Sequence, residues 1–119
     1  MDWSEAQRSR LGEMESQVLE LGEMVCARHL IPGGFDSTPL YRGLPDDMCP
    51  CEHWCYLVRG KLRYRFTDGT AREFEAGDAF HLQAGHLADA LEDAELIEFT
   101  RAEDYRRKVE HLEAQSNSG

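Results

Sequence analysis

The sequence has little positive charge: 13 Lys and Arg residues stand against 23 Asp and Glu residues, a net charge of −10. Because surfaces that bind nucleic acids or anionic membranes are basic, this balance argues against both kinds of partner. No apolar run approaches the roughly 18 residues that cross a membrane, and the first residues lack a basic and apolar secretory signal. We therefore expect a soluble, cytoplasmic protein that binds neither nucleic acid nor membrane.

Motifs of several common enzyme classes are also missing. The sequence contains no Gly-x-Ser-x-Gly nucleophile motif, no phosphate-binding glycine loop and no dinucleotide-binding fingerprint. The pair Gly33 and Gly34 follows Pro32 and is better explained as a turn that ends a strand. Nucleophilic hydrolase chemistry therefore has no support.

Disulfide bonds are not expected either. Three of the four cysteines fall within seven residues, a spacing more typical of metal sites or reduced thiols than of a disulfide scaffold: Cys49, Cys51 and Cys55, with Cys26 apart. At 119 residues and 41% hydrophobic content, the chain is long enough to bury a core without crosslinks, and its length fits one domain. We expect four reduced thiols, with Cys26 and Cys55 in the core.

Helical periodicity is present at both ends of the chain. Five apolar residues near the start recur at intervals of three and four, as on one face of a helix: Leu11, Met14, Val18, Leu21 and Val25. Residues 101 to about 114 carry a similar stripe, and the polar residues 115–119 are expected to fray. The pattern predicts an N-terminal helix (1–22), a β unit (23–100) and a C-terminal helix with its tail (101–119).

The middle of the chain predicts short strands joined by tight turns. Leu62, Tyr64 and Phe66 alternate with basic residues, the period of a strand that is buried on one face. Asp68 and Gly69 then give a hairpin-turn signal. Short strands spaced in this way indicate a sandwich or small barrel. Four alternating basic residues are expected to form a solvated face, or else a patch for an anionic small molecule: Arg59, Lys61, Arg63 and Arg65.

The segment from Tyr56 to Leu62, followed by the one from Gly77 to His86, resembles the two sequence motifs of the cupin superfamily. The likeness covers about residues 24–99 and implies an all-β fold, a cupin-type jelly-roll barrel with an N-terminal and a C-terminal helix. Small cupins commonly pair, so a homodimer is also implied. Family members of this size catalyse isomerase, lyase, cyclase or oxygenase steps. The resemblance thus implies a metal-binding cupin that acts on a small organic molecule in the barrel interior.

The family's metal ligands fall at positions where this sequence departs from the pattern. The glutamate position of the first motif is His53, and its two histidine positions are Asp47 and Cys49. The histidine position of the second motif is Ala88, although His86 lies close by and could substitute from a shifted loop. The usual set of three histidines and one glutamate is absent, so the iron chemistry of that set is not implied.

A cluster of potential ligands precedes the first motif. Five residues occupy alternate positions, so an extended segment would point all of them to one face: Asp47, Cys49, Cys51, His53 and Cys55. Thiolate and imidazole together suit zinc, and also iron or copper, better than magnesium or calcium. We expect a divalent transition metal, zinc first, bound by residues of the set Cys49, Cys51, His53 and His86. Further pocket candidates are Asp47, Cys55, Tyr64 and His81.

The same residues allow other interpretations. His53 is the candidate catalytic residue if it acts as an acid or base, which the ordinary pKa of a histidine permits. Cys49 and Cys51 could form a redox pair, although Cys-x-Cys is not the spacing of thioredoxin-type motifs. The alternative function is a non-catalytic cupin that binds or senses a small molecule, with a structural metal or none. His29 and His111 are expected to be ordinary surface residues.

Overall fold

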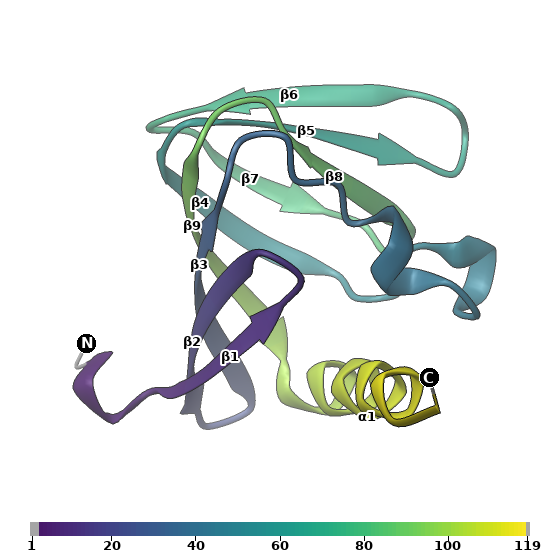
Figure 1. Cartoon of the computed structure of the whole chain (residues 1–119). Coiled ribbons are helices and arrows are strands. Elements are labelled where there is room, and N and C mark those ends of the chain that lie inside the picture. Colours follow the sequence, from purple (N-terminus) through teal and green to yellow (C-terminus); the bar gives the residue numbers. More distant parts are fainter. Residues whose placement is uncertain (1–2, 119) are drawn as a thin grey trace.

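The computed structural model describes residues 3–118, with side chains up to residue 113, and consists mainly of two antiparallel sheets (Figure 1). The larger sheet has six strands in the order β1 (Gln7–Leu11), β2 (Met14–Leu21), β3 (Met24–Ile31), β9 (Ala94–Arg101), β4 (His53–Arg59) and β7 (Ala79–Leu82). The smaller sheet has three, in the order β6 (Ala71–Glu75), β5 (Lys61–Phe66) and β8 (His86–Ala90). Two short 3-10 turns, η2 (Thr38–Tyr41) and η3 (Pro45–Asp47), lie in the connection from β3 to β4.

A β-hairpin stands where the sequence predicts an N-terminal helix. Before β3, the only helical piece among the described residues is the 3-10 turn η1 (Trp3–Glu5). The tetrapeptide Leu-Gly-Glu-Met occurs twice, at 11–14 and 21–24, and each copy closes a two-residue hairpin turn. Gly12 and Gly22, at the first turn positions, have φ angles of 60° and 65°. Left-handed glycines there favour tight strand pairing, so the helix prediction was wrong because turns interrupt the apolar spacing.

The predicted C-terminal helix is present. α1 (Ala102–Ser118) follows β9 directly and lies across one end of the two sheets, near the η2–η3 segment (Figure 1). Two contacts hold it in place. His111 Nε2 lies 3.1 Å from the carbonyl oxygen of Arg42, and Cys51 Sγ lies 3.5 Å from the carbonyl oxygen of Asp104.

The helix extends further than the sequence predicts. Its backbone continues to Ser118, through most of the tail that was expected to fray, while Gly119 lies outside the described residues. Within residues 3–118, no helix combines the length and the apolar character that crossing a membrane requires.

The interior divides into an apolar half and a half rich in polar side chains. Four leucines between the two sheets are at most 2% exposed: Leu57, Leu62, Leu82 and Leu96. The rings of Phe74 and Phe80 stack beside them, with centroids 3.8 Å apart, and Cys55 belongs to the same core. A second, smaller cluster includes Leu112 of α1 and the buried residues Tyr41, Cys49, Cys51 and Leu87. Cys49 and Cys51 therefore lie in the half that α1 covers.

The alternating basic residues of β5 form an ion-paired outer face. Arg63 and Arg65 both contact Asp89 of β8, at 3.3 and 2.8 Å, and Arg65 also contacts Asp36 at 3.0 Å. Because these two guanidinium groups already have carboxylate partners, the structure favours a solvated face over a patch for anionic ligands.

The two sheets are joined at isolated points. Among residues 3–118, no continuous hydrogen-bonded ladder closes the sheets into a barrel. Single bridges pair Asp36 with Asp89 and Cys49 with His86, and both attach connecting segments to β8. The architecture is thus a two-sheet sandwich, and the second of these bridges brings two of the candidate ligands together.

Candidate metal centre

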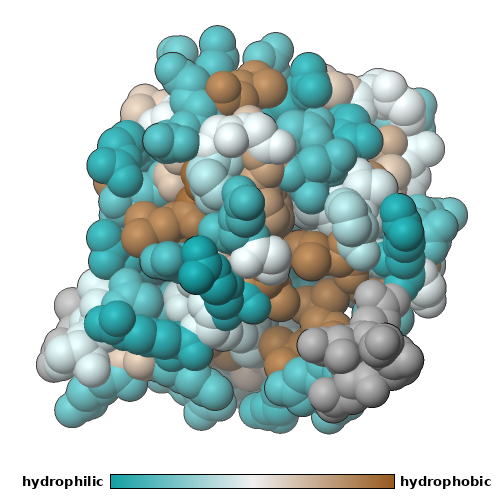
Figure 2. All heavy atoms as spheres, in the orientation of Figure 1, coloured by the Kyte–Doolittle hydropathy of each residue, from teal (hydrophilic) through white to brown (hydrophobic). Residues whose placement is uncertain are grey.

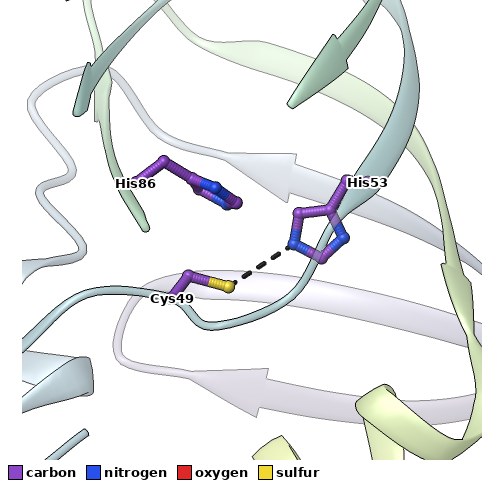
Figure 3. Close-up of side chains that lie close together, drawn as sticks. All are labelled: Cys49, His53 and His86. Atoms are coloured by element: carbon purple, nitrogen blue, oxygen red, sulfur yellow. Dashed lines mark hydrogen bonds between the residues drawn. The ribbon is translucent and has the colours of Figure 1, made fainter. Parts of the chain in front are cut away.

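Three candidate ligands converge in the buried interior (Figure 3). The potential donor atoms of Cys49, His53 and His86 all lie within 4.8 Å of one another. The three residues are 1%, 2% and 4% exposed. Cys49 precedes β4, His53 is the first residue of β4, and His86 is the first residue of β8.

Backbone pairing sets this convergence. The Cys49 amide donates to the carbonyl oxygen of His86 at 2.9 Å, and the Gly85 amide donates to the carbonyl oxygen of Cys49 at 2.8 Å. His53 then follows on the same inward face, as the alternating pattern of the segment predicts. The positions of the three side chains therefore follow from main-chain hydrogen bonds and depend little on long, flexible side chains.

Hydrogen bonds also select the tautomers of the two histidines. His86 Nδ1 lies 2.8 Å from the carbonyl oxygen of Gln83, an atom that only accepts, so Nδ1 carries the proton. His53 Nδ1 lies 3.0 Å from Glu98 Oε1 and 2.8 Å from Thr100 Oγ1. Its Nε2 faces Cys49 Sγ at 3.5 Å. Both rings thus keep Nε2 available as a ligand atom, and a carboxylate behind a ligating histidine is a common support in metal sites.

Glu98 lies at the centre of a buried polar chain. Its Oε1 contacts His53, its Oε2 lies 3.4 Å from His29 Nε2, and His29 Nδ1 lies 2.6 Å from Ser16 Oγ. Burial alone would raise the pKa of Glu98, but His53 and His29 outweigh it and hold that pKa well below its usual value. Glu98 is therefore an ionised acceptor that orients both rings.

The electrostatics favour a thiolate at Cys49. The hydrogen bond from Cys51 is the largest influence, and together with Lys108 and His53 it outweighs burial and lowers the pKa of Cys49 well below that of a free thiol. Cys51 acts as the donor and its pKa is raised, so it stays a neutral thiol. Burial opposes a charge on His53, but Glu98 raises its pKa to about 9. Thiolate is the form of cysteine that binds metals and reacts as a nucleophile.

The donor set fits a divalent transition metal. Two imidazole nitrogens and one thiolate are borderline-to-soft ligands, of the kind that bind zinc, iron or copper, and catalytic zinc sites use three protein ligands with one open position. The hydrogen-bond supports of both histidines are already in place, the lowered pKa of Cys49 favours its thiolate, and a bound ion would displace the Nε2 proton that the raised pKa of His53 implies. Cys49, His53 and His86 are therefore the residues that could hold the ion.

A cavity of about 330 Å³ adjoins the two histidines. His53, His86 and Glu98 contribute to its polar side, while Phe35, Leu40 and Leu112 give it apolar walls. Hydrophobic side chains gather near the middle of the face seen in Figure 2. The volume lies at the lower end of the range for ligand pockets, so it suits a small organic molecule.

The other predicted site residues lie in different surroundings. Tyr64 is buried and lines the cavity. Cys51 is buried beside Cys49 but is not part of the group of three converging donors. Cys55 packs in the apolar core between the sheets and does not line the cavity.

Besides Cys55, two more of the pocket candidates lie away from the cavity. Asp47 is exposed in η3, where its carboxylate accepts a hydrogen bond of 2.9 Å from the Gly43 amide, because the chain there forms a turn and not a strand. His81 is exposed on β7 and pairs with Glu52, since its neighbours on either side are the residues that face the core. Neither residue reaches the cavity.

Several residues of the site were missed by the sequence analysis. His29 was expected at the surface, but it is 8% exposed and lines the cavity. Glu98 interrupts an apolar strand on the same face as Leu96, and Lys108 lies on the apolar stripe of α1 with Tyr105 and Leu112. For Glu98 and Lys108, a charged residue at a position predicted to face inward was the signal in the sequence that could have identified them.

No family model and no curated protein matches the sequence, so the comparison rests on solved structures. An RmlC-like cupin from Shewanella frigidimarina superposes with a TM-score of 0.66 at 19% identity, over 88% of this chain and 93% of that one. The oxalate decarboxylase of Lactobacillus farciminis, solved as a formate complex, gives a TM-score of 0.64 at 15% identity over 85% of this chain. The fold is therefore similar to that of solved cupin structures.

The match differs in extent between the two cupins. This chain spans about a third (32%) of the oxalate decarboxylase chain but nearly all of the Shewanella protein. At these identities the likeness concerns the cupin fold, and the chemistry must be argued from the residues of this chain.

Proposed function

We propose that this cupin binds a divalent transition metal through Cys49, His53 and His86 and acts on a small organic molecule held in the adjoining cavity. The supporting observation is the convergence of three buried donors, with their donor atoms within 4.8 Å of one another. Zinc suits the donor set best, with iron or copper next. The expected reaction is an isomerase, lyase, cyclase or oxygenase type step.

The chain itself supplies orientation and exclusion of water. Glu98 and Thr100 hold the Nδ1 proton of His53, and the Gln83 carbonyl oxygen holds that of His86. The apolar walls separate a bound molecule from solvent. When bound, the metal would supply Lewis-acid activation of an oxygen atom of the ligand or of a water molecule.

A second candidate function uses the same residues without a metal. The contact of 3.5 Å between Cys49 Sγ and His53 Nε2, with Glu98 behind the imidazole, has the form of a cysteine nucleophile paired with a histidine. His53 would then be the acid or base, as one interpretation of the sequence has it. The non-catalytic binding or sensing cupin, the other sequence-based alternative, would use the cavity alone.

Metal content is the first test. Tag-free protein is purified under reducing conditions, supplied with zinc, desalted and analysed by plasma mass spectrometry. We expect about one equivalent of zinc per chain, lost in Cys49→Ser and retained in Cys55→Ala, the matched control at a buried thiol outside the group. A wild-type protein that retains no zinc, iron or copper while folded contradicts the metal proposal.

Reactivity then separates the remaining functions. A metal-free protein whose Cys49 reacts with iodoacetamide faster than free cysteine at pH 7 would favour the nucleophile. If zinc binds but its removal lowers only thermal stability and leaves ligand binding intact, a structural metal in a binding protein is favoured. The homodimer and the cytoplasmic location stay predictions from the sequence.

A further inference from the structure

Lys108 is a buried lysine on the covering helix. It is 7% exposed and lines the cavity together with Glu98 and Tyr105. A lysine is almost never so deeply buried without a partner, because removing an ammonium group from water is costly. We therefore expect the Lys108 ammonium to contact a negatively charged group.

The protein does not provide a direct partner among the residues whose side chains are described. No carboxylate there lies within ion-pair distance of the Lys108 ammonium, and Nζ lies over the ring of Tyr105, 5.8 Å from its centroid. Glu98, the buried carboxylate of the cavity, is already shared between His53 and His29. Lys108 nevertheless stays charged: burial lowers its pKa, but Tyr41, Cys49 and Glu98 outweigh burial and raise it well above the usual value.

The charges of the loaded site also leave room for an anion. Glu98 and the thiolate of Cys49 carry one negative charge each, Lys108 carries one positive charge, and a divalent metal adds two. Arg10 and Glu113 also line the cavity, but both are exposed and their charges are opposite in sign, so together they add no net charge to this count. The buried space would therefore keep one uncompensated positive charge, which a single anionic group neutralises.

We infer that Lys108 anchors the anionic end of the ligand, and that the ligand is a small organic monocarboxylate whose body lies against the apolar walls of the cavity. This inference rests on the proposed function, since it names the class of molecule that the same site takes. A carboxylate matches the single surplus charge, whereas a phosphate monoester at neutral pH carries more charge than the site compensates. Ammonium-to-carboxylate hydrogen bonds are among the stronger ones in proteins.

The test compares carboxylates with their neutral amides. Acetate and acetamide, and benzoate and benzamide, are titrated by calorimetry into zinc-loaded and zinc-free protein. The variants are Lys108→Met, which keeps the length of the side chain, and Arg106→Met, a charge loss on the exposed side of the same helix. We expect wild-type protein and Arg106→Met to bind at least one carboxylate tenfold or more tightly than its amide, and Lys108→Met to lose that preference.

The outcomes separate this inference from the proposed function. Zinc content is measured on every sample, and near-ultraviolet circular dichroism verifies folding, with Lys108→Gln as a second variant if Lys108→Met misfolds. Equal carboxylate affinity in wild type and folded Lys108 variants, or no preference for carboxylate over amide in wild type, overturns the inference. Protein that takes up no metal overturns the metal proposal; a Lys108-dependent preference that persists in it supports the anion site but overturns the charge count, in which the surplus positive charge comes from the ion.

Discussion

The two halves of the interior are built from the same strands but differ in chemistry. Along β4, the inward residues change from His53 through Cys55 to Leu57, and along β9 they change from Glu98 to Leu96 toward the same end. The apolar half gains stability from burial and close packing. The polar half needs a partner for every buried charge, and contacts among the strands provide one for Glu98 and for His53 but not for Lys108. The same strands therefore contribute apolar residues that stabilise the fold at one end and polar residues that could bind a metal or ligand at the other.

The largest effect is expected in the apolar half. Leu96→Ala removes a side chain that is 2% exposed and should lower the free energy of unfolding by about 2–5 kcal/mol, because the surrounding core relaxes only partly. Urea unfolding followed by tryptophan fluorescence measures the loss. Zinc per folded chain should stay at the wild-type level. A loss of zinc from folded Leu96→Ala protein would show that the two halves are coupled.

Zinc should stabilise the protein through the polar half. At a free zinc concentration about 100 times its dissociation constant, the free energy of unfolding should rise by about 2.7 kcal/mol, since the ion binds the folded state. Thermal melts with zinc or with a chelator measure the shift. His86→Gln should abolish it, whereas His81→Gln, at an exposed histidine outside the site, should retain it. The same zinc-dependent shift in His86→Gln would remove His86 from the centre.

Glu98 should affect the metal more than the fold. Glu98→Gln keeps the shape of the side chain but removes the charge that supports His53, so zinc affinity should fall by about 10- to 100-fold. Competition with a chromogenic chelator measures the affinity. Glu95→Gln is the matched control, because Glu95 lies on the same strand and pairs with Arg28 on the other face. Unchanged zinc affinity in Glu98→Gln would show that the charge of Glu98 does not support His53 as a zinc ligand.

The smallest effect is expected outside both halves. The hydrogen bond from Thr38, aided by Arg65, lowers the pKa of Asp36 below its usual value. A lowered pKa adds stability above the unfolded-state pKa, and this stability is lost as the pH falls through the folded-state value. Asp36→Asn should therefore cost about 0.5 kcal/mol at pH 7, because the pair is exposed, and almost nothing near pH 2. Urea unfolding of both proteins at the two pH values measures the difference. An equal cost at both would assign the effect to hydrogen bonding alone.

Part of the fold was predictable because local signals matched the tertiary structure. The alternation through Leu62 and Tyr64 identified β5 and its buried face. The apolar stripe after Arg101 identified α1. The same kind of periodicity failed at residues 7–21, where the repeated Leu-Gly-Glu-Met turns were the stronger signal, since a left-handed glycine in a two-residue turn favours a hairpin.

The candidate site was predictable to a similar extent. Cys49 and His53 were singled out because they alternate in one segment, and alternation survives in any extended chain. Asp47, two positions earlier, failed because the chain turns there with a φ of 54°. His29, Glu98 and Lys108 were not found, since each comes from a different element and gains its role only through partners distant in sequence.

By itself, the sequence determined the all-β class, the reduced state expected of its thiols and the inward face of the segment that carries Cys49 and His53. These follow from composition and from periodicities that act within a few residues. Only the tertiary structure decided that His86 joins them, because a single backbone bridge between Cys49 and His86 aligns two segments far apart in the chain. The buried ammonium of Lys108 is likewise a tertiary result, since its surroundings exist only when α1 closes over the cavity.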